Sequence, residues 1–474
     1  MSLSWPELFP DGCLPEKRLR NRAIEIGEAM TERPGAAMTE AFDGWGDTRN
    51  AYNFFVNKRM SLTVLLDPPM RALGRALHDL PGVTTVLCVQ DTTEINLSHL
   101  NSMKGLGEIG NPKNRGLFLH VGLAVDVDGI PLGLLEEQTW IRAPSEHGKA
   151  KARRTKAFEA KESLRWWTTI EQAERRVGRP GLLLHVGDRE NDIYEVFERA
   201  RDTRYRLLVR AAQDRKVEGE HGLLWAQTEA FSTSNDVQTV AVSERPAKGA
   251  NPARAARVAS VTVRFGAVTL CAPRGAKGTV AAWAVMVREV QPPAGVEPIE
   301  WLLLTLDPIT SFAEAWQCVE WYRCRWRIEE FFKVLKTGCR IEARQFESLP
   351  PFEVSLGLAM LTSVRLLALT KQARHEPDAP ASTALSPDEE RVLLRHAEVH
   401  GKGGVARLTL QACVRLIAEL GGYKGRSCDG PPGWITLWRG YRRLHALVEG
   451  YQLAKAGRAP TVRESEVQIK LRSI

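Results

Sequence analysis

Two short apolar runs, each leading directly into an aspartate, constrain the fold of this chain most strongly. Residues 83–89 form a β-branched run that ends in Gln90-Asp91, and residues 182–186 form a nearly all-apolar run that ends in Gly187-Asp188. Short runs without polar alternation are typical of strands buried on both faces of a sheet. The chain is therefore predicted to contain an α/β core with a mixed sheet.

The segments around these runs predict the remaining elements of the core. Residues 117–125 and 131–140 flank an Asp-Val-Asp-Gly turn and predict a hairpin. Helical spacing follows over 156–177, then strands at 205–209 and 301–306, and a long helix over 312–336. This order of strands and helices is that of a ribonuclease H-like fold, an analogy of topology that does not by itself give function.

The length of 474 residues exceeds one ordinary core, so several domains are expected. Residues 1–70 predict short helices, and residues 71–345 predict the α/β domain with a β-rich insertion at about 213–300. Residues 350–474 are predicted to be helical, with a linker-like segment rich in Pro, Ala and Ser at 376–386.

Composition narrows the protein classes further. The eight cysteines include no Cys-x-x-Cys pair, so neither a zinc knuckle nor a disulfide framework is indicated. The N-terminus has no signal-peptide pattern, and the apolar stretch 354–364 is too short to span a bilayer. We expect a cytoplasmic protein without a membrane segment.

The charge balance allows a polyanionic partner. The formal net charge is +8 and the pI about 9.1. Basic residues outnumber acidic ones in segments 142–180, 241–280 and 322–344. Such segments can supply phosphate contacts, although a charge run is more often only a solvated face.

The segment 322–333 carries the most informative pattern. At about 100° per residue, the side chains of this segment and of the turn that follows it divide between two faces of a helix. One face carries Tyr322, Arg325, Glu329 and Lys336, and the opposite face carries Cys324, Ile328, Phe331 and Leu335. One face can therefore be buried while the other presents a carboxylate beside two cations and a phenol. A surface helix with ordinary ion pairs would give the same pattern.

Three acids together would suit a two-metal site: Asp91, Asp188 and Glu329. Either aspartate alone is more often a turn former or helix cap. Carboxylates prefer Mg²⁺ or Mn²⁺, and two such ions roughly 3.5–4 Å apart can activate a water or a 3′-hydroxyl and stabilise the leaving oxygen of a phosphodiester. Arg325 and Lys336 would offset phosphate charge, and Tyr322 would donate to a phosphate oxygen.

Several segments occur in one order along nearly the whole chain: Asp91-Thr92-Thr93, Asp188-Arg189-Glu190, Trp301-Leu302-Leu303-Leu304-Thr305, the run from Arg325 to Phe331, and Leu420-Gly421-Gly422. This set resembles the Asp-Asp-Glu (DDE) transposases of bacterial insertion sequences. Within them it is most similar to the insertion-sequence-four branch, which contains the Tn5 enzyme and carries a Tyr-Arg-Glu-Lys signature.

The resemblance implies a cut-and-paste DNA transposase with a ribonuclease H-like core. Such enzymes nick at the transposon end, form and reopen a DNA hairpin, and join the end to target DNA. They act as homodimers in which each subunit catalyses on the double-stranded DNA end bound mainly by the other. The region 1–70 would bind the DNA end, and the region 350–474 would pair subunits.

The resemblance also implies roles for single residues. Asp91, Asp188 and Glu329 would be the metal ligands and would hold two Mg²⁺ or Mn²⁺ ions in each active site. Phosphates near the cut would be contacted by Tyr322, Arg325 and Lys336, and a flipped base would be stacked by Trp301 with Arg210 nearby. Arg20 and Arg22 would contact the DNA end. A core aromatic at a strand start is the alternative for Trp301.

Two other functions remain open on the sequence. One is a related metal-dependent nuclease that cleaves but does not join DNA, and the other is a domesticated, non-catalytic DNA-binding protein. A carboxylate-pair glycosidase would leave the basic segments and the 322–336 pattern unexplained.

Overall fold

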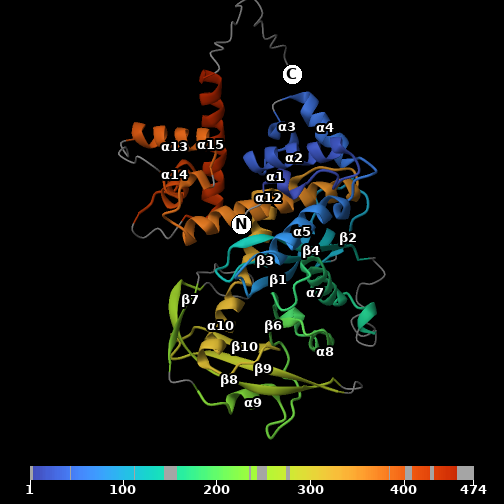
Figure 1. Ribbon diagram of the computed structural model, residues 1–474, viewed down its shortest axis with the longest axis vertical. Helices are drawn as coiled ribbons and strands as arrows, with labels where there is room; N and C mark the ends of the chain where they lie inside the picture. Colours follow the sequence, from blue (N-terminus) through green and yellow to red (C-terminus); the bar gives the residue numbers. More distant parts are fainter. Residues whose placement is uncertain are drawn as a thin grey trace, which may run out of the picture. The chain divides into compact units, whose positions relative to one another are not determined.

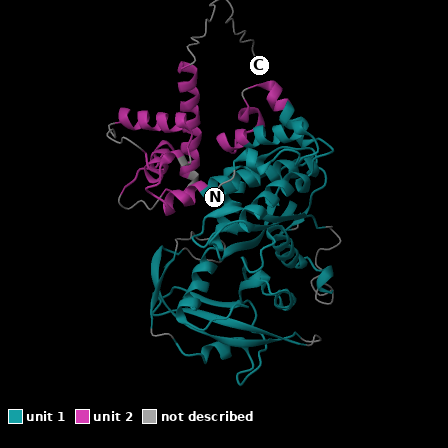
Figure 2. Cartoon of the chain, viewed as in Figure 1, with its two compact units in different colours: residues 1–27, 50–368 teal, residues 28–49, 369–474 magenta. Residues whose placement is uncertain are grey.

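The computed structural model describes residues 4–42, 44–111, 113–142, 157–233, 236–242, 254–273, 278–383, 385–400, 408–426 and 432–455. The chain forms two compact units, residues 1–27 with 50–368 and residues 28–49 with 369–474 (Figure 2). The larger unit contains the sheet, and the smaller unit is helical within its described residues.

The N-terminal region is helical, as the sequence predicts. Its helices are α1 (Trp5–Leu8), α2 (Lys17–Glu32), α3 (Met38–Ala41), α4 (Trp45–Phe55) and α5 (Leu62–His78). In the larger unit, Trp5 is buried against Gly27 of α2, where an added Cβ would lie 2.4 Å from the indole ring.

One ten-stranded mixed sheet forms the centre of the larger unit. Its strands are β1 (Val86–Asn96), β2 (Gly107–Ile109), β3 (Asn114–Val125), β4 (Pro131–Trp140), β5 (Leu183–Gly187), β6 (Arg206–Arg210), β7 (Gln238–Val242), β8 (Arg257–Cys271), β9 (Thr279–Glu289) and β10 (Glu300–Thr305). The order is β2-β3-β1-β5-β6-β10-β9-β8-β7, with β4 also paired to β3. β1, β5 and β6 are mutually parallel, and β3 runs antiparallel to β1.

The segment 213–300 is rich in strands, as expected, but it is not a separate sheet. β10 pairs with β6 on one side and with β9 on the other, so β9, β8 and β7 extend the central sheet (Figure 1). One helix within this segment, α9 (Leu224–Glu229), packs against β8 and β9. The insertion is therefore continuous with the strands that carry the aspartates.

Helix α7 (Leu164–Val177) packs closely on the sheet and on α5 because two glycines remove side chains at the contacts. A Cβ on Gly122 of β3 would lie 2.7 Å from Cγ2 of Thr169, and one on Gly74 of α5 would lie 2.4 Å from the carbonyl oxygen of Arg176. The neighbouring short elements are η2 (Phe158–Ala160), η3 (Arg189–Asn191) and α8 (Tyr194–Thr203).

The prediction of a single helix over 312–336 is wrong in detail. The segment forms α10 (Phe312–Arg323), α11 (Trp326–Lys333) and a π-helical turn, η4 (Val334–Gly338), followed by η5 (Ile341–Ala343). Between α10 and α11 the backbone makes i→i+3 bonds, from the N–H of Arg325 to Tyr322 and from that of Ile328 to Arg325. In such i→i+3 turns, residues that are three positions apart in the sequence lie on the same side of the helix.

The remaining chain is helical within its described residues: α12 (Leu349–His375), η6 (Ala381–Thr383), α13 (Pro387–Val399), α14 (Leu410–Leu420) and α15 (Trp434–Lys455). α12 is long and apolar enough to cross a membrane, but 78% of its most apolar window is buried inside the protein, which accounts for its composition. The linker expected at 376–386 is wrong, because Ala381 and Leu385 are buried in the core of the smaller unit.

Candidate active site

Asp91 and Asp188 come together through the register of two parallel strands. β1 pairs with β5 from Val86↔Leu183 to Val89↔Val186. The same offset two residues further places Asp91 level with Asp188, on the same face of the sheet. The prediction that Asp91 ends its strand is wrong, because β1 continues to Asn96 along β3. Asp91 lies just beyond the parallel pairing instead.

Glu329 reaches the aspartates through Arg325. The Nη2 of Arg325 lies 2.6 Å from Oε1 of Glu329, and its Nη1 lies 3.4 Å from Oδ2 of Asp91. The side chain of Arg325 is 12% exposed. Helix α11 therefore presents a carboxylate to β1, with a guanidinium bridging the two acids.

Asp188 affects the ionisation of both Asp91 and Glu329. Burial and the charge of Asp188 raise the pKa of Asp91 to about 7. Burial also raises the pKa of Glu329, with Asp188 adding to the rise and Arg325 opposing it. Like charges close together in a partly dry site disfavour ionisation until a cation arrives.

Within the described ranges, no group of three or more His, Cys, Asp or Glu side chains is arranged to hold a metal ion. Arg325 supplies the positive charge between Asp91 and Glu329 in this structure. The donor chemistry of three carboxylates nevertheless fits a divalent cation of the Mg²⁺ or Mn²⁺ type.

Trp301, Tyr322 and Arg210 gather beside the acids. The rings of Trp301 and Tyr322 meet edge to face with centroids 5.8 Å apart, and the guanidinium carbon of Arg325 lies 6.0 Å from the Tyr322 ring. Arg210 pairs with Leu303 of β10 and donates to the carbonyl of Glu300 at 3.0 Å. Burial lowers the pKa of Arg210, and Tyr322 opposes this change.

Lys336 lies further away, on the π-helical turn. Its Nζ is 4.0 Å from Oε1 of Glu342, which accepts from the backbone N–H of Asn96 at 2.9 Å. Lys336 lines an open groove of about 630 Å³ with Asn96, Ser98, His99, Thr337, Arg340, Glu342 and Ala343. The groove adjoins the end of β1, and its charged lining residues are Lys336, Arg340 and Glu342.

Arg20 and Arg22 are engaged within the N-terminal helices. Nε of Arg20 donates to the carbonyl of Phe9 at 2.7 Å and lies 3.3 Å from Asp11, and Arg22 pairs with Glu25 at 2.7 Å. These partners all lie within residues 9–25. Parts of two basic segments, residues 143–156, 243–253 and 274–277, lie outside the described residues.

Comparison with known proteins decides the family. Residues 9–60 match the family described as transposase DNA-binding, residues 160–365 match the transposase DDE domain, and residues 361–459 match the transposase Tn5 dimerisation domain. The chain belongs to the Tn5 family of DDE transposases. It is a DNA transposase of the Tn5 type, and its DDE domain makes it an enzyme. DDE transposases generally use divalent metal ions.

Among solved structures, the transposase is similar to the cryo-EM structure of the piggyBac transposase synaptic complex with hairpin DNA. The sequence identity is 10%, and the match covers 94% of this chain and 73% of that chain, with a TM-score of 0.32. A score this low does not establish a shared fold. Asp188 and Glu329 fall inside the matched DDE domain, and Asp91 precedes it.

Sequence reasoning missed Arg165, which lies between the first two acidic motifs of the transposase. Its Nε donates to Oγ1 of Thr92 at 2.9 Å, and its Nη2 donates to Glu190 at 2.9 Å. A lone arginine at the start of an amphipathic helix gives no signal in the sequence. The Asp-Thr-Thr and Asp-Arg-Glu motifs do give a signal, because they contain Thr92 and Glu190, the two hydrogen-bond partners of Arg165.

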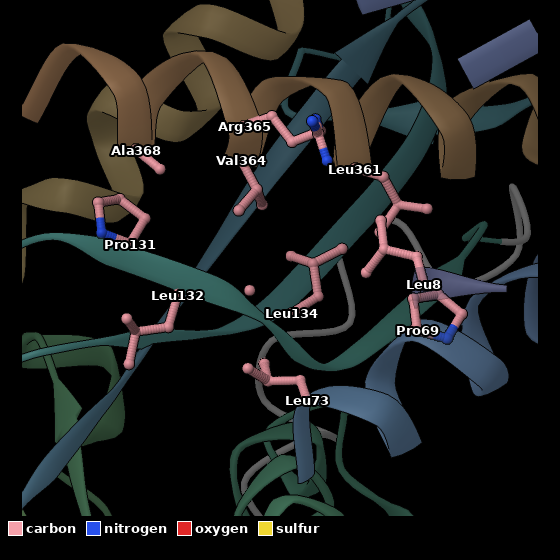
Figure 3. Close-up of a pocket in the computed structure, with 11 residues that line it drawn as sticks. Leu8, Pro69, Leu73, Pro131, Leu132, Leu134, Leu361, Val364, Arg365 and Ala368 are labelled. Atoms are coloured by element: carbon pink, nitrogen blue, oxygen red, sulfur yellow. The ribbon is translucent and has the colours of Figure 1, made fainter. Parts of the chain in front are cut away.

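An apolar cavity elsewhere in the larger unit is too small for a ligand. It has a volume of about 30 Å³ and is lined mainly by aliphatic side chains from α5, β4 and α12, with Arg365 the polar exception (Figure 3). A void of this size holds at most a water molecule. It is a packing defect, not a substrate site.

Proposed function

We propose that this transposase carries out cut-and-paste transposition by metal-dependent nicking, hairpin formation and resolution, and strand transfer. The observation that carries the proposal is the convergence of three acids from separate parts of the chain: Asp91, Asp188 and Glu329. The charges of Asp188 and Glu329 both raise the pKa of Asp91, which supports a shared site.

Asp91, Asp188 and Glu329 would hold two Mg²⁺ or Mn²⁺ ions. The bound ions would supply Lewis-acid activation of a water or 3′-hydroxyl and stabilise the leaving oxygen. For the acids to bind ions, the guanidinium of Arg325 would leave its place between Asp91 and Glu329. It would then be available to a phosphate oxygen, which it suits through paired N–H groups.

The other side chains would orient DNA. Tyr322 and Arg325 would contact the phosphate at the cut, and Lys336 would contact a phosphate in the groove beside β1. Trp301 would stack a flipped base, with Arg210 nearby. Stacking contributes about 1–3 kcal/mol per base, enough to favour a strained hairpin.

The strand order supports a ribonuclease H-like core. Taken alone, β4-β3-β1-β5-β6 has three parallel strands and an antiparallel pair; Asp91 lies in β1, and Asp188 directly follows β5, its parallel neighbour. We assign residues 1–70 to DNA-end binding, 71–345 to catalysis and 350–474 to dimerisation. The partners would be transposon ends and target DNA, acted on by a homodimer in the cytoplasm, without a membrane.

The decisive test is Glu329→Gln. The variant keeps the shape of the side chain but loses its charge, so nicking of a transposon-end duplex should fall by at least about 100-fold, while gel shifts show unchanged end binding. Normal nicking would remove Glu329 from the site. A strand-transfer assay with precut ends separates a transposase from a nuclease that cannot join DNA.

A further inference from the structure

A continuous chain of polar side chains is buried behind the acids, on the opposite face of the sheet. Side chains alternate along a strand, so β1 directs Asp91 to one face and both Gln90 and Thr92 to the other. α7 covers this second face. The members of the chain, in spatial order, are Arg165, Thr92, His120, Gln90, His185 and Glu174.

The first half of the chain crosses from α7 to β3. Nε of Arg165 donates to Oγ1 of Thr92 at 2.9 Å. Oγ1 of Thr92 lies 2.9 Å from Nδ1 of His120, its direct partner in the β1–β3 register. Nε2 of His120 lies 3.4 Å from Oε1 of Gln90. Two strands are thereby joined through side chains as well as through their backbones.

The second half returns to α7 by way of β5. Nε2 of Gln90 lies 3.4 Å from Nδ1 of His185, and Nε2 of His185 lies 3.0 Å from Oε1 of Glu174. Gln90, His120 and His185 are 0% exposed, and Glu174 is 6% exposed. Water does not reach these groups, so each depends on its protein neighbours for hydrogen bonds.

The two ends of the chain, together with the Gln90 amide, which has its nitrogen toward His185 and its oxygen toward His120, fix the direction of the bonds. A guanidinium can only donate and an ionised carboxylate can only accept. Each group between Arg165 and Glu174 therefore accepts from one side and donates to the other. Both imidazoles are then neutral with the proton on Nε2. Burial lowers the pKa of His120 well below its usual value, which agrees with a neutral ring.

We propose that this buried polar chain is a positioning device for the active site, which sets the spacing of Asp91 and Asp188 by joining β3, β1 and β5 at their level. Gln90, His120 and His185 are its positioning residues. Arg165 extends the device to the turn after Asp188, because its Nη2 also holds Glu190. The inference rests on the proposed metal site.

The test measures Mn²⁺ binding to the DNA-free, full-length protein by electron paramagnetic resonance, with thermal unfolding measured alongside. His185→Leu breaks the chain at a ring that lies on the face opposite to the acids. We expect it to weaken Mn²⁺ binding by about 10-fold, as changes behind metal ligands do. The matched control is His78→Leu, which removes a histidine bonded to the carbonyl of Val177 at the end of α7 but outside the chain. This control should bind Mn²⁺ normally.

A second pair separates positioning from folding. Thr92→Ser keeps the hydroxyl and should keep the affinity, whereas Thr92→Val has the same shape without it and should bind Mn²⁺ about 10-fold more weakly. All variants are compared at a fixed interval below their own unfolding temperatures. Equal affinities in His185→Leu, Thr92→Val and the wild type would overturn the proposal.

Glu329→Gln distinguishes a failure of the positioning proposal from a failure of the proposed function. If Glu329→Gln weakens Mn²⁺ binding but breaking the chain does not, the metal site stands and the positioning device is wrong. If Glu329→Gln has no effect, the metal site itself is wrong. Nitrogen-15 spectra of the histidine rings give an independent readout, since a proton on Nδ1 of His120 or His185 would also contradict the proposed direction of the chain.

Discussion

Asp91 of the acidic site contributes to how the stability of the metal-free enzyme depends on pH. Burial and Asp188 raise the pKa of Asp91 to about 7, whereas an unfolded aspartate titrates near 3.9. Between these values the folded protein holds a proton that the unfolded chain has lost. The contribution of Asp91 to the free energy of unfolding should therefore fall as pH rises from about 4 to about 7 and stay level above, by at most about 4 kcal/mol.

Asp91→Asn should make the slope shallower by the part that Asp91 contributes, because the amide does not titrate, while Glu137, whose pKa burial raises to about 8, keeps a slope of its own. Urea unfolding in the presence of a chelator, at pH 5 and pH 7.5, measures the difference. Asp79→Asn, at the exposed end of α5, serves as the control and should retain the slope. An unchanged slope in Asp91→Asn would show that another group titrates.

The bridging position of Arg325 gives a second prediction. Arg325→Ala leaves Asp91 and Glu329 without their nearest counter-charge, so the metal-free variant should be less stable than the wild type. Divalent ions should then raise its unfolding temperature more than they raise that of the wild type, although nicking is lost. Arg327→Ala is the control, because Arg327 pairs with Glu330 on the same helix. Equal shifts by Mn²⁺ would contradict the bridging role.

At the scale of elements, the loop that follows Asp188 is held by a buried ion pair. Asp192 accepts from Nε of Arg215 at 2.9 Å and from the backbone N–H groups of Ala212 and Gln213 at 2.7 and 3.0 Å. The side chains of Arg215 and Asp192 are 8% and 0% exposed. Because removing one partner leaves a buried charge unpaired, Arg215→Met should lower the free energy of unfolding by about 3–5 kcal/mol.

Urea unfolding measures this loss of stability, and an exposed ion pair serves as the control. Arg175→Gln removes the partner of Glu171 on α7, where the side chains are 61% and 37% exposed. That change should cost about 0.5 kcal/mol or less. Similar losses in Arg175→Gln and Arg215→Met would mean that the buried pair does not fix the loop.

Elements were predictable where one physical cause dominated. The apolar runs that became β1 and β5 reflect burial on both faces; Asp188 directly follows β5, whereas Asp91 lies within β1. Periodicity could not show the break at Cys324, because i→i+3 turns keep Tyr322 and Arg325 on one side. The same pattern therefore fits a continuous and a broken helix.

The contacts of the buried polar chain could not be predicted from a single sequence. His120 and His185 interrupt otherwise apolar strands, which is a signal of a buried polar role. Their partners come from α7 and β1, however, and only the folded sheet brings these together. Sequence pattern identifies the residue types, and the register identifies the contacts.

At the scale of the whole molecule, the candidate functions divide between regions. The larger unit carries the acids and the predicted end-binding residues Arg20 and Arg22, whereas most of the Tn5 dimerisation match belongs to the smaller unit. A dimer of this chain therefore has two acidic sites and two end-binding regions. Which site acts on which DNA end is the question that a mixed dimer can answer.

Mixing two inactive variants tests the expectation from the family resemblance that each subunit acts on the end held by its partner. One variant carries Arg22→Glu, expected to lose end binding in gel shifts but keep its acids; the other carries Glu329→Gln, expected to bind ends but not nick. If catalysis crosses between subunits, co-folding the two should restore nicking to about a quarter of the wild-type level, since half of randomly paired two-fold dimers are mixed and each holds one productive site. If each subunit acts on its own DNA end, the mixture should remain as inactive as its components.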